Sequence, residues 1–283
     1  SLDGVQEDDF TFVFGYPART NEYMPSYSVE LITEIGNPKK IELRETRLDI
    51  FNKYASKDPK VRLQYATKHA RIANYWKKMI GESGGIKRMK GIEVKQDYET
   101  DFATWVASSN NTQYANLLPE FERVYTELTP LIIASGYMTE AGMAIEIVKF
   151  ANSYNKLISL SKNDPENKEA INNVISKLKK RQIDKSELIV KEVMVEMLRL
   201  YDKNLSAEFK PEFFNTIHSK YKGDYKAYTN YVFSKSIFDK EEKLMMFLDN
   251  YKPKSYKKLL KDPAYNMAKE MGELYNTKFS KKM

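Results

Sequence analysis

The sequence contains no cysteine in its 283 residues. Disulfide bonds and thiol catalysis are therefore excluded, although a thiol-free protein suits the periplasm as well as a reducing cytosol. No stretch approaches the roughly 18 consecutive apolar residues that span a bilayer, so we expect no membrane partner. No fixed-period repeat is present either, which argues against a solenoid of regular repeats.

Histidine is scarce, since only His69 and His218 occur. Neither has a second His or Cys at ligand spacing, so we expect no metal site and no cofactor. Gly81-Glu82-Ser83-Gly84-Gly85 is close to the sequence around the nucleophile of chymotrypsin-like proteases. In that fold, however, the serine lies on a loop between barrel strands. Here Ser83 follows a predicted helix, so we interpret it as part of a helix-terminating loop and expect no catalytic residue in this chain.

A strong excess of one charge is also absent. The chain has 46 Lys and Arg against 39 Asp and Glu, a net charge of +7. The two signs are mostly mixed along predicted helical faces, as in residues 38–45, which is typical of a solvated helix surface. Only residues 177–181 and 252–261 are locally basic. We therefore expect no nucleic-acid partner.

What the sequence does contain, near its start, is one strand without a partner. Residues 9–15 alternate aromatic side chains on one face and run into Tyr16-Pro17, which predicts a β-strand. A lone strand leaves its backbone N–H and C=O groups unpaired. We therefore expect an excised piece of a larger protein, with residues 3–25 ending an incomplete sheet domain and residues 26–283 forming a helical domain.

Asp-Pro pairs mark the expected starts of three helices in the helical part. Asp58-Pro59, Asp164-Pro165 and Asp262-Pro263 each place an N-cap carboxylate before a proline at the first helical position. Apolar residues then recur every three or four positions, as in the stripes over residues 144–158 and 189–201. This pattern predicts an all-α domain with helices over residues 26–35, 38–57, 59–80, 92–108, 114–135, 139–160, 165–181, 185–203, 211–221, 224–235, 240–249, 254–261 and 263–279. The glycine-rich residues 81–91 are the expected mobile connection.

Two stretches carry more specific information. The first covers residues 12–27, and the second runs from residue 47 to residue 77 and includes Asn74-Tyr75-Trp76-Lys77. Together they closely resemble the bacterial serine dipeptidyl peptidases of the dipeptidyl-peptidase 7 and 11 type. In that family a Gly-[Phe/Tyr]-Pro-Gly turn leaves the second β-barrel, and a long helical insertion with an Asn-Tyr-Trp-Lys string follows. Ala18 replaces the family's usual second glycine, so the turn must accept a side chain here.

The resemblance implies a chymotrypsin-like double β-barrel, interrupted by a helical domain that caps the substrate cleft. The family's triad His and Asp would precede this chain, and its nucleophilic Ser would follow it. The resemblance further implies a periplasmic, homodimeric enzyme that removes dipeptides from the free N-terminus of oligopeptides. The alternative is a non-catalytic helical module for peptide binding or scaffolding. The flanking gene sequence would discriminate the two, because only the enzyme needs the triad.

The resemblance also implies one substrate-binding residue, Asn74. The family holds the substrate's α-ammonium with polar side chains, one of them the Asn of this string. A carboxamide oxygen accepts a hydrogen bond from an ammonium without adding a charge. Helical spacing places Leu63, Ala66, Ala70 and Asn74 on one line, where the small side chains leave room for a ligand. From spacing alone a solvated helix Asn is the favoured interpretation, and the family match reverses that preference.

The two aromatic residues of the string are expected to face away from this line. Trp76 should continue Val61, Tyr65 and Ile72 as a packing stripe. The preference at the second substrate residue, acidic or hydrophobic, is set in this family near the nucleophile, outside the chain.

Overall fold

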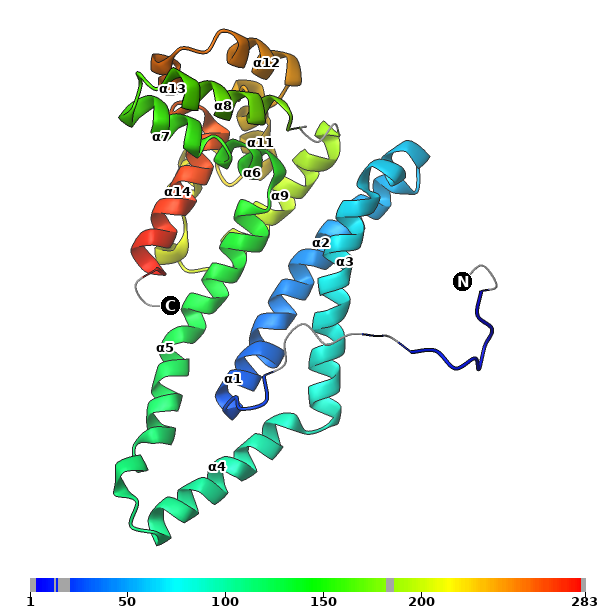
Figure 1. The fold of residues 1–283 in the computed structure, drawn as a ribbon, viewed down its shortest axis with the longest axis vertical. Helices are drawn as coiled ribbons and strands as arrows, with labels where there is room; N and C mark the ends of the chain where they lie inside the picture. Colours follow the sequence, from blue (N-terminus) through cyan, green and yellow to red (C-terminus); the bar gives the residue numbers. More distant parts are fainter. Residues whose placement is uncertain (1–3, 13, 15–20, 182–185, 281–283) are drawn as a thin grey trace.

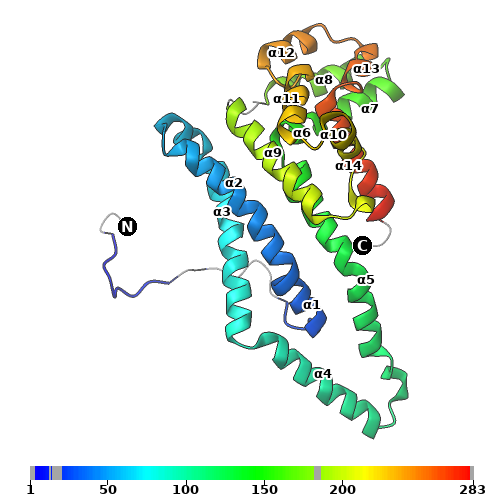
Figure 2. The same cartoon turned by 180° about the vertical axis from the view of Figure 1, so that it is seen from behind.

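The computed structural model describes residues 4–12, 14, 21–181 and 186–280, and its elements are helices (Figures 1 and 2). The chain runs through α1 Ser26–Glu30, the π-helix η1 Leu31–Gly36, α2 Asn37–Ala55, α3 Pro59–Arg88, α4 Gly91–Ser108, η2 Thr112–Tyr114, α5 Leu117–Tyr137, the π-helix η3 Met138–Met143, α6 Glu146–Asn152, α7 Asn155–Asn163, α8 Lys168–Lys179, α9 Glu187–Asn204, η4 Ala207–Phe209, α10 Phe213–Tyr221, α11 Tyr225–Lys235, α12 Glu241–Asp249, η5 Pro253–Ser255, α13 Tyr256–Leu259 and α14 Pro263–Lys278. The all-α prediction is confirmed.

The predicted strand makes no sheet within the described residues. Residues 9–12 and 14 have no regular secondary structure, and the side chains of Phe10, Phe12 and Phe14 are almost fully exposed. Val13 and Gly15 lie outside the described residues, as does most of the Tyr-Pro turn. A single extended segment has no strand with which to form a ladder, so an aromatic face of this kind stays in solvent.

The helices form two regions that meet along α2, α5 and α9. Figures 1 and 2 show α2 and α3 as an antiparallel pair, joined by α4 to the far end of the long helix α5. Helices α6 to α14 form a compact group at the other end of α5. Helix α2 packs against both α3 and α9. No single helix in the described ranges is long and apolar enough to cross a membrane; only one pair of segments bent by 92° (Thr112–Met143 and Glu146–Asn163) passes that test jointly.

Both predicted apolar stripes form the core. Ile147, Val148, Ala151, Tyr154 and Ile158 are buried, and only Ala144 of that stripe stays half-buried. The predicted residues of α9 are all buried: Ile189, Val190, Val193, Met194, Met197, Leu200 and Tyr201. The stripe predicted over residues 189–201 is therefore confirmed as a buried face of α9. Burial of such an apolar face supplies most of a helix's stability in a protein.

The single helix predicted over residues 139–160 is wrong. The backbone leaves the helical region at Ile145 (φ −62°, ψ 121°) and turns again before Asn155, which separates η3, α6 and α7. Close packing accompanies the first break, since Gly142 lies so near Met271 that an added Cβ would come within 2.6 Å of its sulfur. The turn keeps Ile145 itself fully buried. Packing therefore overrides the uninterrupted helical pattern.

The predicted loop over residues 81–91 is also wrong, because α3 continues through Gly84 and Gly85 to Arg88. The turn is confined to Met89 and Lys90, and Lys90 adopts a left-handed conformation (φ 50°). Each glycine in a helix costs about 1 kcal/mol relative to alanine. Contacts that α3 makes with η1 and α2 offset that cost, as described below for Ser83.

The break predicted between residues 35 and 38 does not form either. The backbone stays helical through Asn37 (φ −61°, ψ −46°), and η1 joins α1 to α2. Pro38 has no N–H to donate to the preceding turn, and a local π-helix is one way to accommodate such a gap. Of the three Asp-Pro caps, Asp58 and Asp262 accept N–H bonds from the first turn of α3 and α14, as predicted. Asp164 does not, since α8 starts later and is capped by Asn167.

Candidate substrate-binding face of helix α3

One face of α3 is held against α2 by aromatic packing. Tyr65 and Met79 are its buried side chains, and the ring of Tyr65 lies 4.9 Å from that of Phe51 in α2. Val61 and Ile72 are half-buried on the same side, and so is Trp76. The predicted packing stripe is therefore present, and it determines which way the rest of α3 faces.

The opposite face carries the predicted line of residues. Leu63 is 80% exposed, and Ala66, Ala70 and Asn74 are exposed along the same side of the helix. Asn74 makes no hydrogen bond to the described residues, so its carboxamide oxygen is available as an acceptor. Ala70, one helical turn before Asn74, leaves that side of the amide without a bulky side chain, whereas the exposed Lys77 and Lys78 lie one turn after it. An exposed, unpartnered amide next to small residues can bind a donor such as an ammonium.

A charged network fixes the backbone next to Asn74. The Arg44 guanidinium of α2 donates to the carbonyl of Ile72 at 3.4 Å and lies 5.3 Å from the centre of the Tyr75 ring. It also pairs with Glu140 of η3. Tyr75 thus points toward α2, away from the line of Asn74, although it remains 64% exposed. Sequence reasoning missed this network, because nothing local connects Arg44 with Glu140, 96 residues later.

Glu140 is shared by two arginines. Arg44 and Arg47 each place a guanidinium nitrogen on a different oxygen of the Glu140 carboxylate. All three side chains are largely buried, with 15%, 7% and 12% of their surface exposed. Burial lowers the pKa of Arg47, and the attraction of Glu140 opposes that effect. This cluster of Arg44, Arg47 and Glu140 joins the α2–α3 pair to the rest of the fold.

The hydroxyl of Ser83 forms hydrogen bonds with two neighbouring helical segments. Its hydroxyl donates to the carbonyl of Thr33 at 3.0 Å and accepts from the Asn37 amide at 3.1 Å. The same amide donates to Glu82 at 3.0 Å, and Glu82 also pairs with Lys78. These bonds attach the glycine-rich part of α3 to η1 and α2. Ser83 therefore lies in a helix, and the loop expected around it does not form.

The two histidines have partners other than Ser83. The Nε2 atom of His69 is 3.0 Å from the side-chain oxygen of Asn52, and that of His218 is 2.8 Å from Asp202. Within the described ranges, no group of three His, Cys, Asp or Glu side chains could hold a metal ion. The groups that nucleophilic hydrolysis needs are thus not assembled around Ser83.

Replacing Ser83 with alanine tests this assignment. The change removes the hydroxyl bonded to Thr33 and Asn37, so we expect a loss of about 1 kcal/mol in the free energy of unfolding. We also expect the 283-residue chain to release no dipeptide from peptide substrates, with or without this change. Urea unfolding and a peptide-release assay measure the two effects. Release that disappears in Ser83→Ala would overturn the structural assignment.

Comparison with known proteins shows the family to which the chain belongs. The family model described as Peptidase S46 matches residues 1–283. The chain is 33% identical over 280 residues to an Asp/Glu-specific dipeptidyl-peptidase of Flavobacterium psychrophilum, covering 98% of this chain and 38% of that protein. It is 32% identical over 279 residues to dipeptidyl-peptidase 7 of Phocaeicola vulgatus, covering 95% and 38%. The chain belongs to the peptidase S46 family.

The helical fold is also that of a solved relative. The structure of Porphyromonas endodontalis DPP11 in complex with the dipeptide Arg-Glu superposes with a TM-score of 0.76 at 24% identity, over 93% of this chain and 37% of that one. This likeness shows the fold. The chain thus spans a little over a third of the length of the dipeptidyl peptidases that it matches.

Proposed function

We propose that this chain is the domain that caps the substrate cleft of a serine-type dipeptidyl aminopeptidase, and that Asn74 binds the substrate. The observation that carries the proposal is the exposed Asn74 amide, unpartnered among the described residues, one helical turn from Ala70. Membership of the peptidase S46 family supports it, because the relatives named above are dipeptidyl peptidases. The nucleophile, its base and the oxyanion hole would come from the remainder of the enzyme.

The chemistry of dipeptide removal explains why such a domain is needed. An enzyme that cuts after the second residue must hold the substrate's α-ammonium at a fixed distance from the nucleophile. It must also stop longer chains from threading past that point. In this proposal, the Oδ1 atom of Asn74 accepts a hydrogen bond from the ammonium. The Arg44 bond to the Ile72 carbonyl holds the helix backbone beside Asn74 in place.

The proposal extends to the enzyme's setting. We propose oligopeptides with a free N-terminus as substrates, a periplasmic location and a homodimeric parent enzyme, on the strength of the family resemblance. The preference at the second residue belongs to the part of the enzyme outside this chain. Assays of the full-length enzyme on free and N-acetylated peptides test the proposal. A gene lacking an upstream His and Asp and a downstream Gly-x-Ser-Gly would favour the non-catalytic alternative instead.

A further inference from the structure

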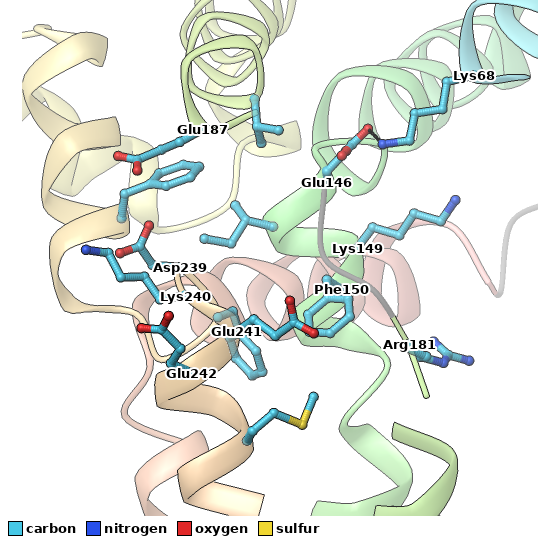
Figure 3. Close-up of a pocket in the computed structure, with 15 residues that line it drawn as sticks. Lys68, Glu146, Lys149, Phe150, Arg181, Glu187, Asp239, Lys240, Glu241 and Glu242 are labelled. Atoms are coloured by element: carbon cyan, nitrogen blue, oxygen red, sulfur yellow. Dashed lines mark hydrogen bonds and ion pairs between the residues drawn. The ribbon is translucent and has the colours of Figure 1, made fainter. Parts of the chain in front are cut away.

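An open hollow of about 880 Å³ lies between α6, α9, α11 and α12, and its lining carries charges of both signs (Figure 3). Among its lining residues, Lys68 pairs with Glu146. Figure 3 shows Asp239 on one side of the hollow, and Lys149 and Arg181 on the other. The Oδ1 atom of Asp239 is buried without a donor among the described residues. Opposite charges so close together select no ligand charge.

A surface of one sign lies elsewhere, on residues 252–261, which include η5 and α13. This segment has no acidic residue and contains five lysines, which we call the lysine surface: Lys252, Lys254, Lys257, Lys258 and Lys261. All five are exposed, and none forms an ion pair with the described residues. Other lysines do pair with carboxylates, as Lys53, Lys179 and Lys210 show. The positive charge of the lysine surface is therefore not neutralised by a direct partner.

The inner side of the same segment fixes its backbone. Leu259 is fully buried, and the half-buried Tyr251 and Tyr256 pack against the core. The hydroxyl oxygens of Tyr251 and of Ser161 in α7 lie 2.8 Å apart and share a hydrogen bond. The lysines thus extend from a folded support, and their flexible stems remain free to reach a partner.

The two ends of the molecule carry opposite charge. Figures 1 and 2 show α13 beside α7 and α8 at one end of the molecule, and the connection between α4 and α5 at the other. Residues 91–128, at that second end, contain seven acidic side chains against two basic ones. A negatively charged plane would therefore orient the molecule with the lysine surface toward it and the acidic end away from it.

We propose that the lysine surface binds the anionic headgroups of a phospholipid bilayer. Clusters of this size bind anionic lipids, because each ammonium is attracted by the negative potential at the membrane surface. A peripheral contact needs no spanning helix. The expectation of no membrane partner rests on the lack of a spanning segment, and so does not bear on a contact of this kind.

The composition of the surface favours a bilayer over other polyanions. All five cations are lysines, which act as point charges, whereas a guanidinium fork is the group that binds one phosphate with two bonds. Point charges on flexible stems match a fluid layer of headgroups that move to meet them. Tyr251 and Tyr256 pack inward, so no exposed ring of this segment can stack on bases. Leu260 is 36% exposed among the lysines and offers an apolar side chain to the interface.

Sedimentation with sucrose-loaded vesicles tests the proposal. At low salt, the 283-residue chain should bind vesicles of equal parts phosphatidylglycerol and phosphatidylcholine at least about tenfold tighter than vesicles of phosphatidylcholine alone. High salt should weaken the binding to the anionic vesicles, because it screens exposed charges. Equal binding to the two kinds of vesicle would overturn the proposal.

Two double variants with the same net charge separate the lysine surface from the charge of the whole chain. Lys257→Gln with Lys258→Gln should weaken vesicle binding by about 25-fold, at about fivefold for each lysine. Lys60→Gln with Lys87→Gln removes two exposed lysines of α3 that have no ion pair with the described residues, and should weaken binding by less than about threefold. Equal losses in the two variants would show a response to net charge alone and would refute the surface.

A charge-preserving variant shows whether the loss reflects charge or folding. Lys257→Arg with Lys258→Arg keeps both positive charges and should bind within about twofold of the parent. The two lysines are exposed and have no ion pair with the described residues, so thermal melts of both variants should match the parent. If the arginine variant lost binding as the glutamine variant does, at an unchanged Tm, attraction between charges would not be the cause and the proposal would fail.

Other occupants of the lysine surface give different results. Tighter binding to a DNA duplex than to anionic vesicles, at equal phosphate concentration, would assign the surface to nucleic acid. Sedimentation velocity at low salt should show a monomer. Oligomers that disappear in Lys257→Gln with Lys258→Gln would assign the surface to the acidic end of a second copy. Either result would overturn the proposal.

The full-length protein provides the last test. It should bind the anionic vesicles within about fivefold of the 283-residue chain. Binding by the chain but not by the full-length protein would mean that the remainder of the protein covers the lysine surface, and would overturn the proposal. Vesicle binding involves no peptide hydrolysis, so its outcome is independent of the role proposed for Asn74.

Discussion

Replacing Asn74 with alanine in the full-length enzyme that carries this chain should lower kcat/KM by about 10- to 150-fold. The change removes a hydrogen bond to the substrate's α-ammonium, and a bond to a charged group contributes roughly 1.5–3 kcal/mol. At about 1.4 kcal/mol per factor of ten, that energy corresponds to the expected loss. Steady-state kinetics on peptides with a free N-terminus measure it.

Two controls make this prediction specific. An N-acetylated peptide has no ammonium to bind, so the variant and the parent should differ little on it. Asn173→Ala changes another exposed helical Asn, on α8, and should leave kcat/KM unchanged. Asn74 is exposed, so thermal melts should show no loss of stability. Activity that is unaffected, or that falls only in proportion to stability, would make Asn74 an ordinary surface residue of the helix.

The largest effect on stability is expected for Glu140→Ala. The change leaves the buried guanidinium groups of Arg44 and Arg47 without their shared carboxylate. Breaking a buried ion pair by removing one partner costs about 3–5 kcal/mol, because the remaining charge stays desolvated. Urea unfolding of the 283-residue chain should therefore show a much lower midpoint.

Glu120→Ala is the matched control for this experiment. Glu120 also pairs with an arginine, Arg123, but both side chains are more than half exposed. Exposed ion pairs contribute little to stability, so the unfolding midpoint should barely move. If both variants lost the same small amount of stability, the cluster of Arg44, Arg47 and Glu140 would contribute no more than a surface ion pair. Its role in joining α2 to η3 would then be refuted.

Much of the fold follows from local patterns. The stripe of α9 is correct in every residue because apolar side chains at helical spacing must share a buried face. Asp58 and Asp262 cap their helices because a carboxylate before a proline satisfies N–H groups that no carbonyl within the helix can reach. The exposed line that ends at Asn74 follows from the same geometry, since the packing stripe of α3 determines the opposite face.

Two incorrect predictions of secondary structure arise from contacts between distant segments. The glycines at 81, 84 and 85 predict a loop, yet Thr33 and Asn37 keep Ser83 in a helix from about 50 residues away. An unbroken apolar pattern predicts one helix over residues 139–160, yet the close approach of Met271 to Gly142 accompanies a break at Ile145. In both places local propensities differ by about 1 kcal/mol per residue, which tertiary contacts exceed.

The sequence by itself determined the helical class, the buried face of α9 and the exposed face of α3, because each depends on the 3.6-residue period of a helix. Its motifs also indicated the dipeptidyl peptidase family that the comparisons confirm. Only the tertiary structure decided that Glu140 joins Arg44 and Arg47, and that Asp239 keeps a buried oxygen without a donor. The physical reason is that the partners and the desolvation of a charged group come from segments far apart in the chain.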